Sequence, residues 1–202
     1  MALSEAQKKA VQHVTGPCLC LAGPGSGKTT VITERTRYLI EEQHIAPANI
    51  LVITFTKAAA SEMKERFGRL MGGGNYGVTF GTFHSVFFWI LRQAYGLWAE
   101  NILKEEQKYQ ILREIIGTLT LEIEDEADFI SGITGEISLI KNDRILLENY
   151  YSQNCPEEIF RKIFDSYQAK LSGKRLIDFD DMLVMCYELL NERPDIRLGW
   201  QK

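Results

Sequence analysis

A glycine-rich segment that ends in lysine and threonine has the clearest chemistry in this sequence. Residues 22–29 read Ala-Gly-Pro-Gly-Ser-Gly-Lys-Thr, which fits the pattern G-x-x-x-x-G-K-[ST] except that Ala22 replaces the first glycine. In such a loop the lysine ammonium neutralises the β- and γ-phosphate oxygens, and the threonine hydroxyl binds Mg²⁺. The pattern predicts that Lys28 and Thr29 bind a nucleotide with its metal ion. The alternative interpretation is a simple turn between a strand and a helix.

The expected phosphate contacts come from consecutive residues of this loop. Gly25 and Gly27 let the chain turn closely around the anion, and the N–H groups of the following helix converge on it. The residues expected to surround the nucleotide are Ala22, Gly23, Pro24, Gly25, Ser26, Gly27, Lys28, Thr29 and Thr30. Kinases, transporters, GTPases and motors all use such a loop, so the loop alone does not identify the reaction.

Alternating strand and helix patterns surround the loop. The apolar run at 18–22 predicts a strand that enters the loop, and residues 28–43 predict the helix that leaves it. A helix is expected earlier at 3–14, and two further strand–helix pairs are expected at 50–55 with 57–70 and at 78–83 with 85–95. Strands that alternate with helices predict an α/β fold with a parallel sheet flanked by helices.

The pattern becomes helical after residue 88. Residues 89–175 contain no convincing strand, and two sets of apolar residues recur there at helical spacing. The sets are Ile111, Leu112, Ile115, Ile116 and Leu119, followed by Ile159, Ile163, Tyr167 and Leu171. We expect residues 1–88 to begin the α/β domain, an all-helical subdomain to interrupt it at 89–175, and residues 176–202 to return to it. A last helix is expected at 181–190.

Charge is unevenly distributed along the chain. The net charge is −4, but residues 1–88 carry +3, residues 89–175 carry −4 and residues 176–202 carry −3. A polyanionic partner is therefore favoured only at the N-terminal part. The apolar runs are too short to cross a bilayer, and the first residues lack a secretory signal, so we expect a cytoplasmic protein without a membrane partner. The four cysteines form no framework, and we expect them reduced and mostly buried.

Five segments in order resemble the UvrD/Rep-type superfamily 1 DNA helicases. They are Leu3-Ser4-Glu5-Ala6-Gln7, the loop at 22–29, residues 53–63 (ITFTKAAASEM), Gly81-Thr82-Phe83-His84-Ser85 and residues 178–183 (DFDDML). The resemblance covers the chain from Leu3 to Leu190. It implies a RecA-like P-loop ATPase domain with a helical insertion. It also implies ATP and Mg²⁺ as cofactors, and 3′ to 5′ translocation on single-stranded DNA with duplex unwinding.

The resemblance implies that Gln7 reads the adenine edge, because an amide can donate and accept together. The alternative is that Gln7 only closes a capping box with Ser4 at the start of the first helix, and both roles can coexist. Thr30 stands where many relatives have an arginine, so the cation that those relatives place near the nucleotide is absent at this position. Pro24 stiffens the loop where the family usually has a small residue, and we expect it to be tolerated.

The resemblance also implies a path for single-stranded DNA. Its expected residues are Phe55, Thr56, Lys57, Thr82, Phe83 and His84. An aromatic ring such as Phe55 can stack on a base, whereas the pattern alone favours a core aromatic. Without its context, His84 could equally be a helix-start histidine without a ligand. Lys57-Ala58 stands where many relatives have Asn-Lys, so the positive charge is moved by one position.

The acidic segment near the C-terminus is not expected to hold Mg²⁺. Only Leu176 and Ile177 precede Asp178, so the long apolar strand that would aim an aspartate at the metal is missing, and Asp180 or Asp181 is expected to cap the following helix. The resemblance implies that the chain ends before the family's second acidic motif and second motor domain. We therefore expect an N-terminal fragment that is inactive alone and works with the remaining helicase domains on single strands and duplex junctions.

Two other functions remain open from the residues themselves. One is a nucleotide-dependent kinase acting on a small molecule, and the other is a non-catalytic nucleic-acid-binding module that retains the loop as a relic. Stimulation of ATPase activity by single strands separates the kinase from the helicase. Substitution of Lys28 separates the non-catalytic module from the kinase and the helicase, because only the non-catalytic module would keep its function after that substitution.

Overall fold

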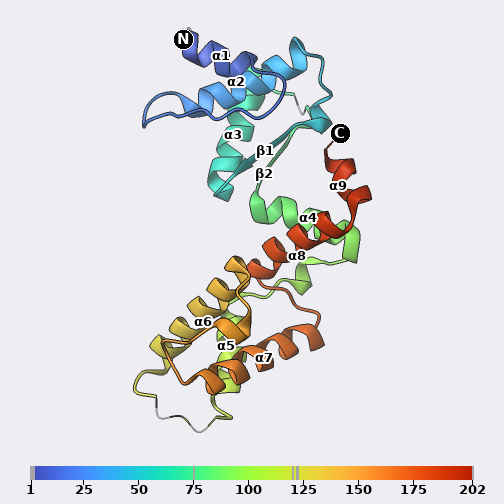
Figure 1. The fold of residues 1–202 in the computed structure, drawn as a ribbon. Helices are drawn as coiled ribbons and strands as arrows, with labels where there is room; N and C mark the ends of the chain where they lie inside the picture. The colour runs from blue at the N-terminus through green and yellow to red at the C-terminus, as the bar shows by residue number, and fades with distance from the viewer. Residues whose placement is uncertain (1–2, 75, 120, 122, 202) are drawn as a thin grey trace. The chain divides into compact units, whose positions relative to one another are not determined.

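The computed structural model describes residues 3–74, 76–119, 121 and 123–201, and these divide into two compact units. One unit ends at Val86 and the other begins at Phe87, within helix α4 (Phe83–Tyr95). The first unit is α/β with a small parallel sheet, and the second is helical (Figure 1). The α/β class is therefore confirmed for the first unit.

Two parallel strands form the sheet of the first unit. Strand β1 (Leu51–Thr54) pairs with β2 (Thr79–Thr82) so that Leu51 lies opposite Thr79 and Thr54 opposite Thr82. The β-branched residues of β1 suit a strand that is covered by other elements, and Val52 is buried. The strands predicted at 50–55 and 78–83 are thus confirmed, and they end together at one edge of the sheet.

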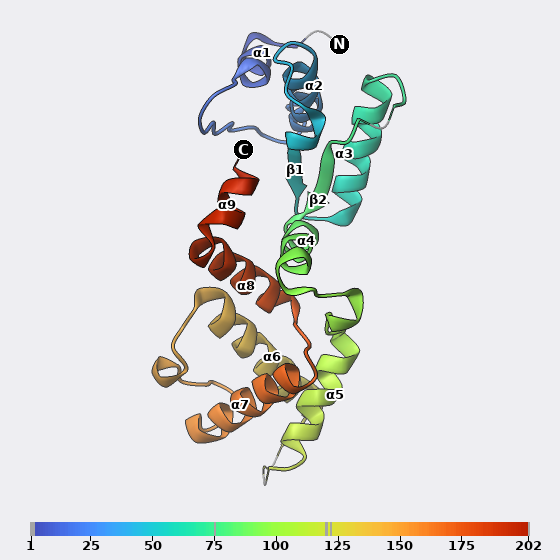
Figure 2. The ribbon, with the colours of Figure 1, turned by 90° about the vertical axis from the view of Figure 1, so that its right-hand side faces the viewer.

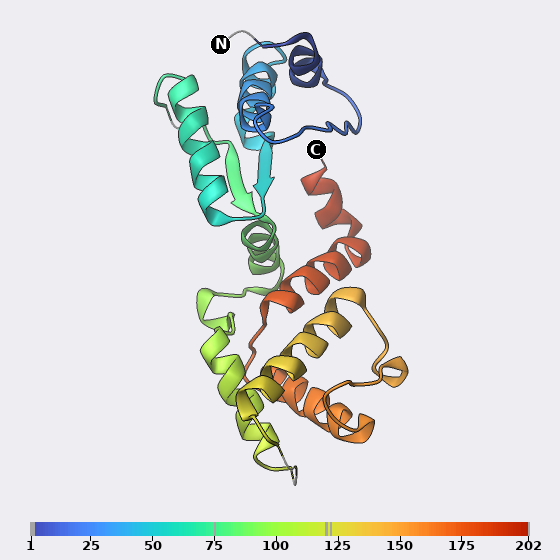
Figure 3. The ribbon, with the colours of Figure 1, turned by 90° about the vertical axis from the view of Figure 1, so that its left-hand side faces the viewer.

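Among the described residues of the first unit, three α-helices accompany this sheet. Helix α1 (Glu5–Gln12) packs against α2 (Lys28–Glu41), α2 packs against α3 (Lys57–Leu70), and α3 contacts both strands. Figures 1 and 3 show α3 lying along β1 and β2. A short 3₁₀ helix, η1 (Pro47–Asn49), leads into β1. The predicted helices are confirmed, with α3 matching its predicted range and the others shifted by a few residues at their ends.

The strand expected at residues 18–22 does not form. This segment is irregular, and Leu19 and Leu21 are 87% and 90% exposed. An apolar strand is stable only when neighbouring strands take its N–H and C=O groups, and among the described residues β1 and β2 pair with each other. The prediction that the cysteines are mostly buried is wrong for the same reason, since Cys18 and Cys20 are exposed while Cys186 is buried.

The second unit is built from helices around one apolar core. Its longer helices are the remainder of α4, α5 (Glu105–Ile116), α6 (Glu126–Asp143), α7 (Glu157–Gly173), α8 (Phe179–Glu192) and α9 (Pro194–Trp200). Short 3₁₀ helices η2 (Ala99–Asn101) and η3 (Leu147–Asn149) join them. Figure 2 shows α5, α6 and α7 gathered around this core. Helix α9 begins at Pro194, beyond the last helix that the sequence predicts.

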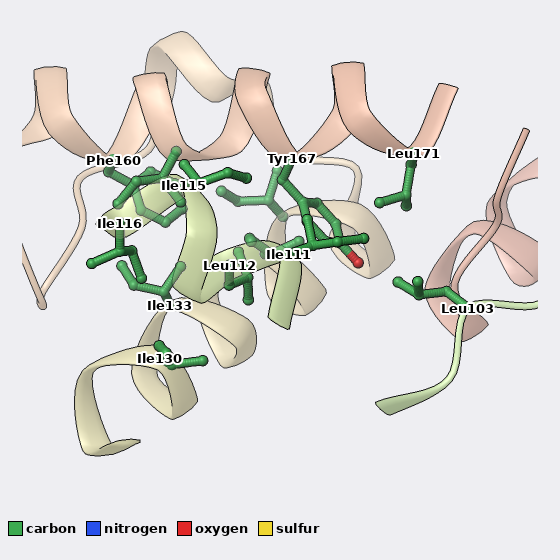
Figure 4. Packing of buried hydrophobic residues seen from close by; sticks show 13 residues of the cluster. Leu103, Ile111, Leu112, Ile115, Ile116, Ile130, Ile133, Phe160, Tyr167 and Leu171 are labelled. Carbon is green, nitrogen blue, oxygen red and sulfur yellow. The ribbon is translucent and has the colours of Figure 1, made fainter. Parts of the chain in front are cut away.

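Both predicted apolar stripes of this unit reach its core. Ile111 and Ile115 of α5 face Tyr167 and Phe160 of α7, whereas Leu112 lies on the side of α5 toward Ile133 of α6 (Figure 4). Phe160 is 1% exposed, whereas Ile159 of the predicted stripe packs only at the edge of the core. The helical period therefore located the buried face of α7 to within one residue at its first turn.

A buried ion network ties α5, α6, α7 and α8 together. The Lys141 ammonium lies 2.7 Å from carboxylate oxygens of both Asp178 and Asp181, and the Tyr167 hydroxyl donates to Asp178 at 2.9 Å. Lys108 of α5 lies 3.8 Å from Asp180. Burial opposes ionisation of Asp178, but the Lys141 charge and hydrogen bonds outweigh it and hold the pKa of that carboxyl below its usual value.

The prediction that Asp180 or Asp181 caps the last long helix is wrong. Asp178 is the N-cap of α8, where its carboxylate accepts the Asp181 backbone N–H at 2.8 Å, and Asp181 returns the bond in a capping box. Asp180 instead accepts hydrogen bonds from Ser138 and Asn142 on α6. The spacing of three residues between Asp178 and Asp181 is the sequence signal that identifies this cap.

The segments that flank the helical core meet in a short parallel bridge. Ile102 pairs with Ile177, Leu103 donates its N–H to the Ile177 carbonyl, and Ile177 donates to Asn101, both at 2.8 Å. Residues 176–201 belong to the same compact unit as the helices of residues 87–175. The division into 1–88, 89–175 and 176–202, with the last part belonging to the α/β domain, stays a prediction. In the described part of the chain, no helix has the length and apolar character needed to cross a membrane.

Candidate nucleotide and nucleic-acid site

The glycine-rich loop is organised by its own carbonyl groups. The Lys28 ammonium donates to the carbonyl oxygen of Gly23 at 2.8 Å and lies 3.5 Å from that of Ala22, while the Ser26 hydroxyl donates to Gly23 at 2.7 Å. These bonds fold the loop back on the start of α2 and hold the lysine side chain along it. A cation fixed beside backbone N–H groups at a helix N-terminus suits a phosphate chain.

Pro24 fits the turn without loss of a needed N–H group. Gly23, Pro24, Gly25 and Ser26 form a turn in which Ser26 donates its N–H to the Gly23 carbonyl at 3.4 Å, and Gly25 has φ +73°. Proline at the second position and glycine with positive φ at the third are typical of a type II turn. The backbone N–H that proline lacks is not one that closes this turn, which agrees with the expectation that Pro24 is tolerated.

The start of α2 has no side-chain cap. Gly27 is its N-cap with φ +80° and makes no side-chain capping bond, and its carbonyl accepts the Val31 N–H at 2.9 Å. The first-turn N–H groups of a helix lack intrahelical partners, so an anion at this end is stabilised. Thr29 lies in this first turn and is half-buried, whereas Thr30 is exposed.

Gln7 joins the first helix to the loop. Its side-chain oxygen accepts the Ser4 N–H at 2.8 Å, which completes the capping box of α1, and its side-chain nitrogen donates to the Ser26 carbonyl at 2.9 Å. The capping interpretation is therefore confirmed, and it does not exclude a role at the nucleotide. An amide nitrogen carries two donor hydrogens, so one remains for a second acceptor when Ser26 takes the other.

A cavity of about 700 Å³ opens beside the loop. Its lining includes Gln7, Gly23, Ser26 and Lys28, so the structure brings together the first helix and the loop that the sequence singled out separately. Arg35 also lines this cavity and was not anticipated. Its spacing of two helical turns after Lys28 was the available signal, because residues seven apart share one face of a helix.

Two phenylalanines meet at the edge where both strands end. Phe55 follows Thr54 and Phe83 follows Thr82, and these threonines are register partners, so the rings come together with centroids 5.8 Å apart. Phe55 is 90% exposed and Phe83 is 40% exposed. The interpretation of Phe55 as a core aromatic is therefore excluded, and the two rings present an accessible apolar surface.

The neighbouring polar residues begin the helices that follow the strands. The Thr56 hydroxyl accepts the Ala59 N–H at 3.1 Å and caps α3, and the Thr82 hydroxyl accepts the Ser85 N–H at 3.2 Å. Lys57 is exposed in the first turn of α3, and His84 is half-buried in the first turn of α4. All six residues predicted for the DNA path thus lie at one edge of the sheet.

The first unit is thus an α/β domain with a glycine-rich loop suited to a phosphate chain and with an exposed aromatic edge where its two strands end. The profile of the UvrD/REP helicase N-terminal domain matches residues 3–202, so the chain belongs to that family.

Curated relatives support the same family. The chain is 34% identical over 207 residues to the ATP-dependent DNA helicase PcrA of Bacillus subtilis, covering 99% of this chain and 28% of that protein. It is 34% identical over 208 residues to the ATP-dependent DNA helicase Rep of Escherichia coli, covering 100% of this chain and 30% of that protein. The chain therefore spans less than a third of the length of these relatives.

Proposed function

We propose that this chain is the ATP-binding portion of an ATP-dependent DNA helicase of the UvrD/Rep type, with a RecA-like first domain. Membership of the family and relatives that are named ATP-dependent DNA helicases support this function. Their names support ATP as the nucleotide and DNA as the substrate. The direction of translocation, 3′ to 5′, is proposed from the family resemblance.

The nucleotide site is proposed to use the loop, α2 and Gln7. The loop N–H groups and Lys28 would hold the β- and γ-phosphates, and Gln7 would hydrogen-bond the adenine edge. Thr29 would supply one hydroxyl to Mg²⁺, and the described residues lining the cavity include no carboxylate that would add a second ligand. Bound Mg²⁺ neutralises charge on the phosphates. Thr30 and the loop backbone at residues 22–26 complete the proposed cradle.

The strand site is proposed to use the aromatic edge. Phe55 and Phe83 would stack on unpaired bases without sequence preference, as aromatic platforms do in other single-strand-binding proteins. Lys57 would neutralise a phosphate, and Thr56, Thr82 and His84 would address the sugar–phosphate backbone. The excess of basic residues in the N-terminal part of the sequence suits this role.

The packing of α2 against α3 is the observation that supports coupling between the nucleotide site and the strand site. Helix α2 starts at Lys28 in the loop, and α3 starts at Lys57, two residues after Phe55. A shift of α2 on nucleotide binding would therefore be passed to α3 and to the aromatic edge through a direct helix contact, because packed helices move as rigid elements. This arrangement supports a motor more than a kinase, which needs no accessible aromatic edge.

The test uses the complete protein that carries this domain. Single-stranded DNA is expected to raise its ATPase rate, and Lys28→Ala is expected to abolish both hydrolysis and unwinding. ATPase activity indifferent to DNA would favour the kinase, and unwinding that survives Lys28→Ala would favour the relic module.

Residues 1–202 alone are proposed to bind nucleotide without turnover. The carboxylates of Asp178, Asp180 and Asp181 are held by Lys141, Ser138 and Asn142 within the helical unit. Hydrolysis needs an acid that orients water and metal at the phosphates, and these three are otherwise engaged. Steady-state ATP turnover by purified 1–202 at the rate of the complete protein would refute this part of the proposal.

A further inference from the structure

Arg35 binds the end of the first helix from the second. One of its guanidinium nitrogens, Nη1, donates to the carbonyl oxygens of Ala10 at 3.0 Å and Val11 at 3.4 Å, and it also donates to the His13 carbonyl. These residues belong to the last turn of α1 and its C-cap. The last carbonyls of a helix lack intrahelical partners and form the negative end of its dipole, so one cation satisfies several of them.

The two helices joined in this way carry opposite parts of the nucleotide site. Helix α1 carries Gln7 one turn before the carbonyls that Arg35 binds, and α2 carries Lys28 two turns before Arg35. A second tie links the same elements at the other end, where Gln7 donates to the Ser26 carbonyl at 2.9 Å. The position of the Gln7 amide relative to the loop therefore depends on both ties.

The two ties do not respond to a nucleotide in the same way. A base that binds the Gln7 amide shares its donor nitrogen with the Ser26 carbonyl, so this tie is affected directly by the base. The Arg35 contacts lie at the far end of α1 and use backbone acceptors only, so a base that engages Gln7 need not break them. Arg35 also lines the cavity that holds Gln7 and Lys28.

We propose that Arg35 is a positioning residue for recognition of the nucleotide base: it clamps α1 onto α2 and so presents the Gln7 amide at the right distance from the phosphate loop. The proposal rests on the proposed nucleotide-binding function. Arg35 acts through Gln7 and does not affect the binding of the phosphates by the loop.

Arg37 is a matched control on the same helix. It is also half-buried, but it pairs with the carboxylates of Glu34 at 2.6 Å and Glu41 at 3.8 Å, both on α2 itself. Its removal deletes the same charge from α2 without touching α1. Arg35→Lys is the conservative variant, since an ammonium reaches fewer carbonyls than a guanidinium but retains the cation.

The experiment measures equilibrium binding of ATP, GTP and inorganic tripolyphosphate to the complete protein and its variants. Arg35→Ala is expected to lower the affinity for ATP about tenfold, which is the effect of about one hydrogen bond. The affinity for tripolyphosphate is expected to change less than about twofold. The preference of the Arg35→Ala variant for ATP over GTP is expected to fall together with its ATP affinity. Arg35→Lys recovers part of the ATP affinity, and Arg37→Ala matches the wild type. Gln7→Ala gives the same loss, and the Gln7→Ala/Arg35→Ala double variant loses little more.

Several results would overturn the proposal. Equal losses for ATP and tripolyphosphate would mean that Arg35 supports the loop or the fold as a whole. Unchanged ATP affinity in Arg35→Ala, or fully additive losses with Gln7→Ala, would mean that it does not act through Gln7. Failure of the proposed function itself has a different signature, in which wild-type protein binds neither ATP nor tripolyphosphate, or Lys28→Ala binds both normally.

Discussion

Replacement of Phe55 by alanine separates strand binding from folding more cleanly than any other change at the aromatic edge. The ring is 90% exposed, so folding hides only about a tenth of it. Full burial of a phenylalanine is worth roughly 1.5–3 kcal/mol, so the change costs about 0.3 kcal/mol or less of unfolding free energy. The melting temperature is therefore expected to move by no more than about two degrees.

The expected effect on single-strand binding is much larger. Stacking of one base on an aromatic ring is worth about 1–3 kcal/mol, which corresponds to about 5- to 150-fold in affinity. Phe83 is 40% exposed and its ring lies against Phe55, so Phe83→Ala loses stacking and also removes buried surface. The two variants are thus expected to weaken DNA binding similarly but to differ in stability.

The assay is fluorescence anisotropy of a labelled oligothymidine with the complete protein, at one fixed salt concentration because phosphate contacts are salt-dependent. Phe55→Tyr keeps a stacking ring and serves as the matched control, and it is expected to bind within about twofold of wild type. Wild-type affinity in Phe55→Ala would refute the stacking role of this edge. Equal loss in the tyrosine variant would show that the ring does not act by stacking.

Three other predictions follow from the same structure. Lys28→Ala is expected to remove triphosphate binding, measured by calorimetry, while leaving the unfolding curve in urea unchanged, because the lysine is exposed. Lys141→Met is expected to lower the unfolding free energy by about 3–5 kcal/mol, because it leaves Asp178 buried without its counter-ion. Adding Asp178→Asn to the same chain should restore part of the loss. A loss below about 1 kcal/mol in Lys141→Met would contradict this prediction. Burial raises the pKa of the Cys186 thiol to about 11 from an ordinary value of 9.0, so stability should decline as pH rises between these values, and a thiol reagent at pH 8 should label Cys18 and Cys20 but not Cys186. Rapid labelling of Cys186 in the folded protein would contradict its burial.

Local patterns in the sequence were sufficient for most elements of this fold. The helix at residues 57–70 and the strands at 51–54 and 79–82 follow from side-chain period and from the residues that begin and end each element. The glycine-rich loop was also recognisable, because glycine, lysine and threonine at this spacing serve one kind of chemistry. The buried stripes of α5 and α7 followed from helical spacing alone.

Other features depended on partners far along the chain. Residues 18–22 are as apolar as a strand, but a strand needs a neighbour to take its backbone hydrogen bonds, and the described chain pairs β1 with β2. The partner of Asp178 is Lys141, which is 37 positions earlier, and no local rule connects them. Assignment of the helix cap to Asp180 or Asp181 failed because residue type alone allows any of three nearby acids to cap a helix, and the structure selects Asp178, paired with Asp181 three residues later.

The sequence by itself determined which residues could bind phosphate and which could stack on a base, because these abilities belong to side-chain type and local spacing. The tertiary structure decided where they act. Parallel register brought Phe55 and Phe83 into contact, and the packing of α1 on α2 brought Gln7 to Ser26 and Arg35 to the end of α1. Such contacts arise from the packing of whole elements, whose relative placement depends on the sum of many weak interactions along the chain.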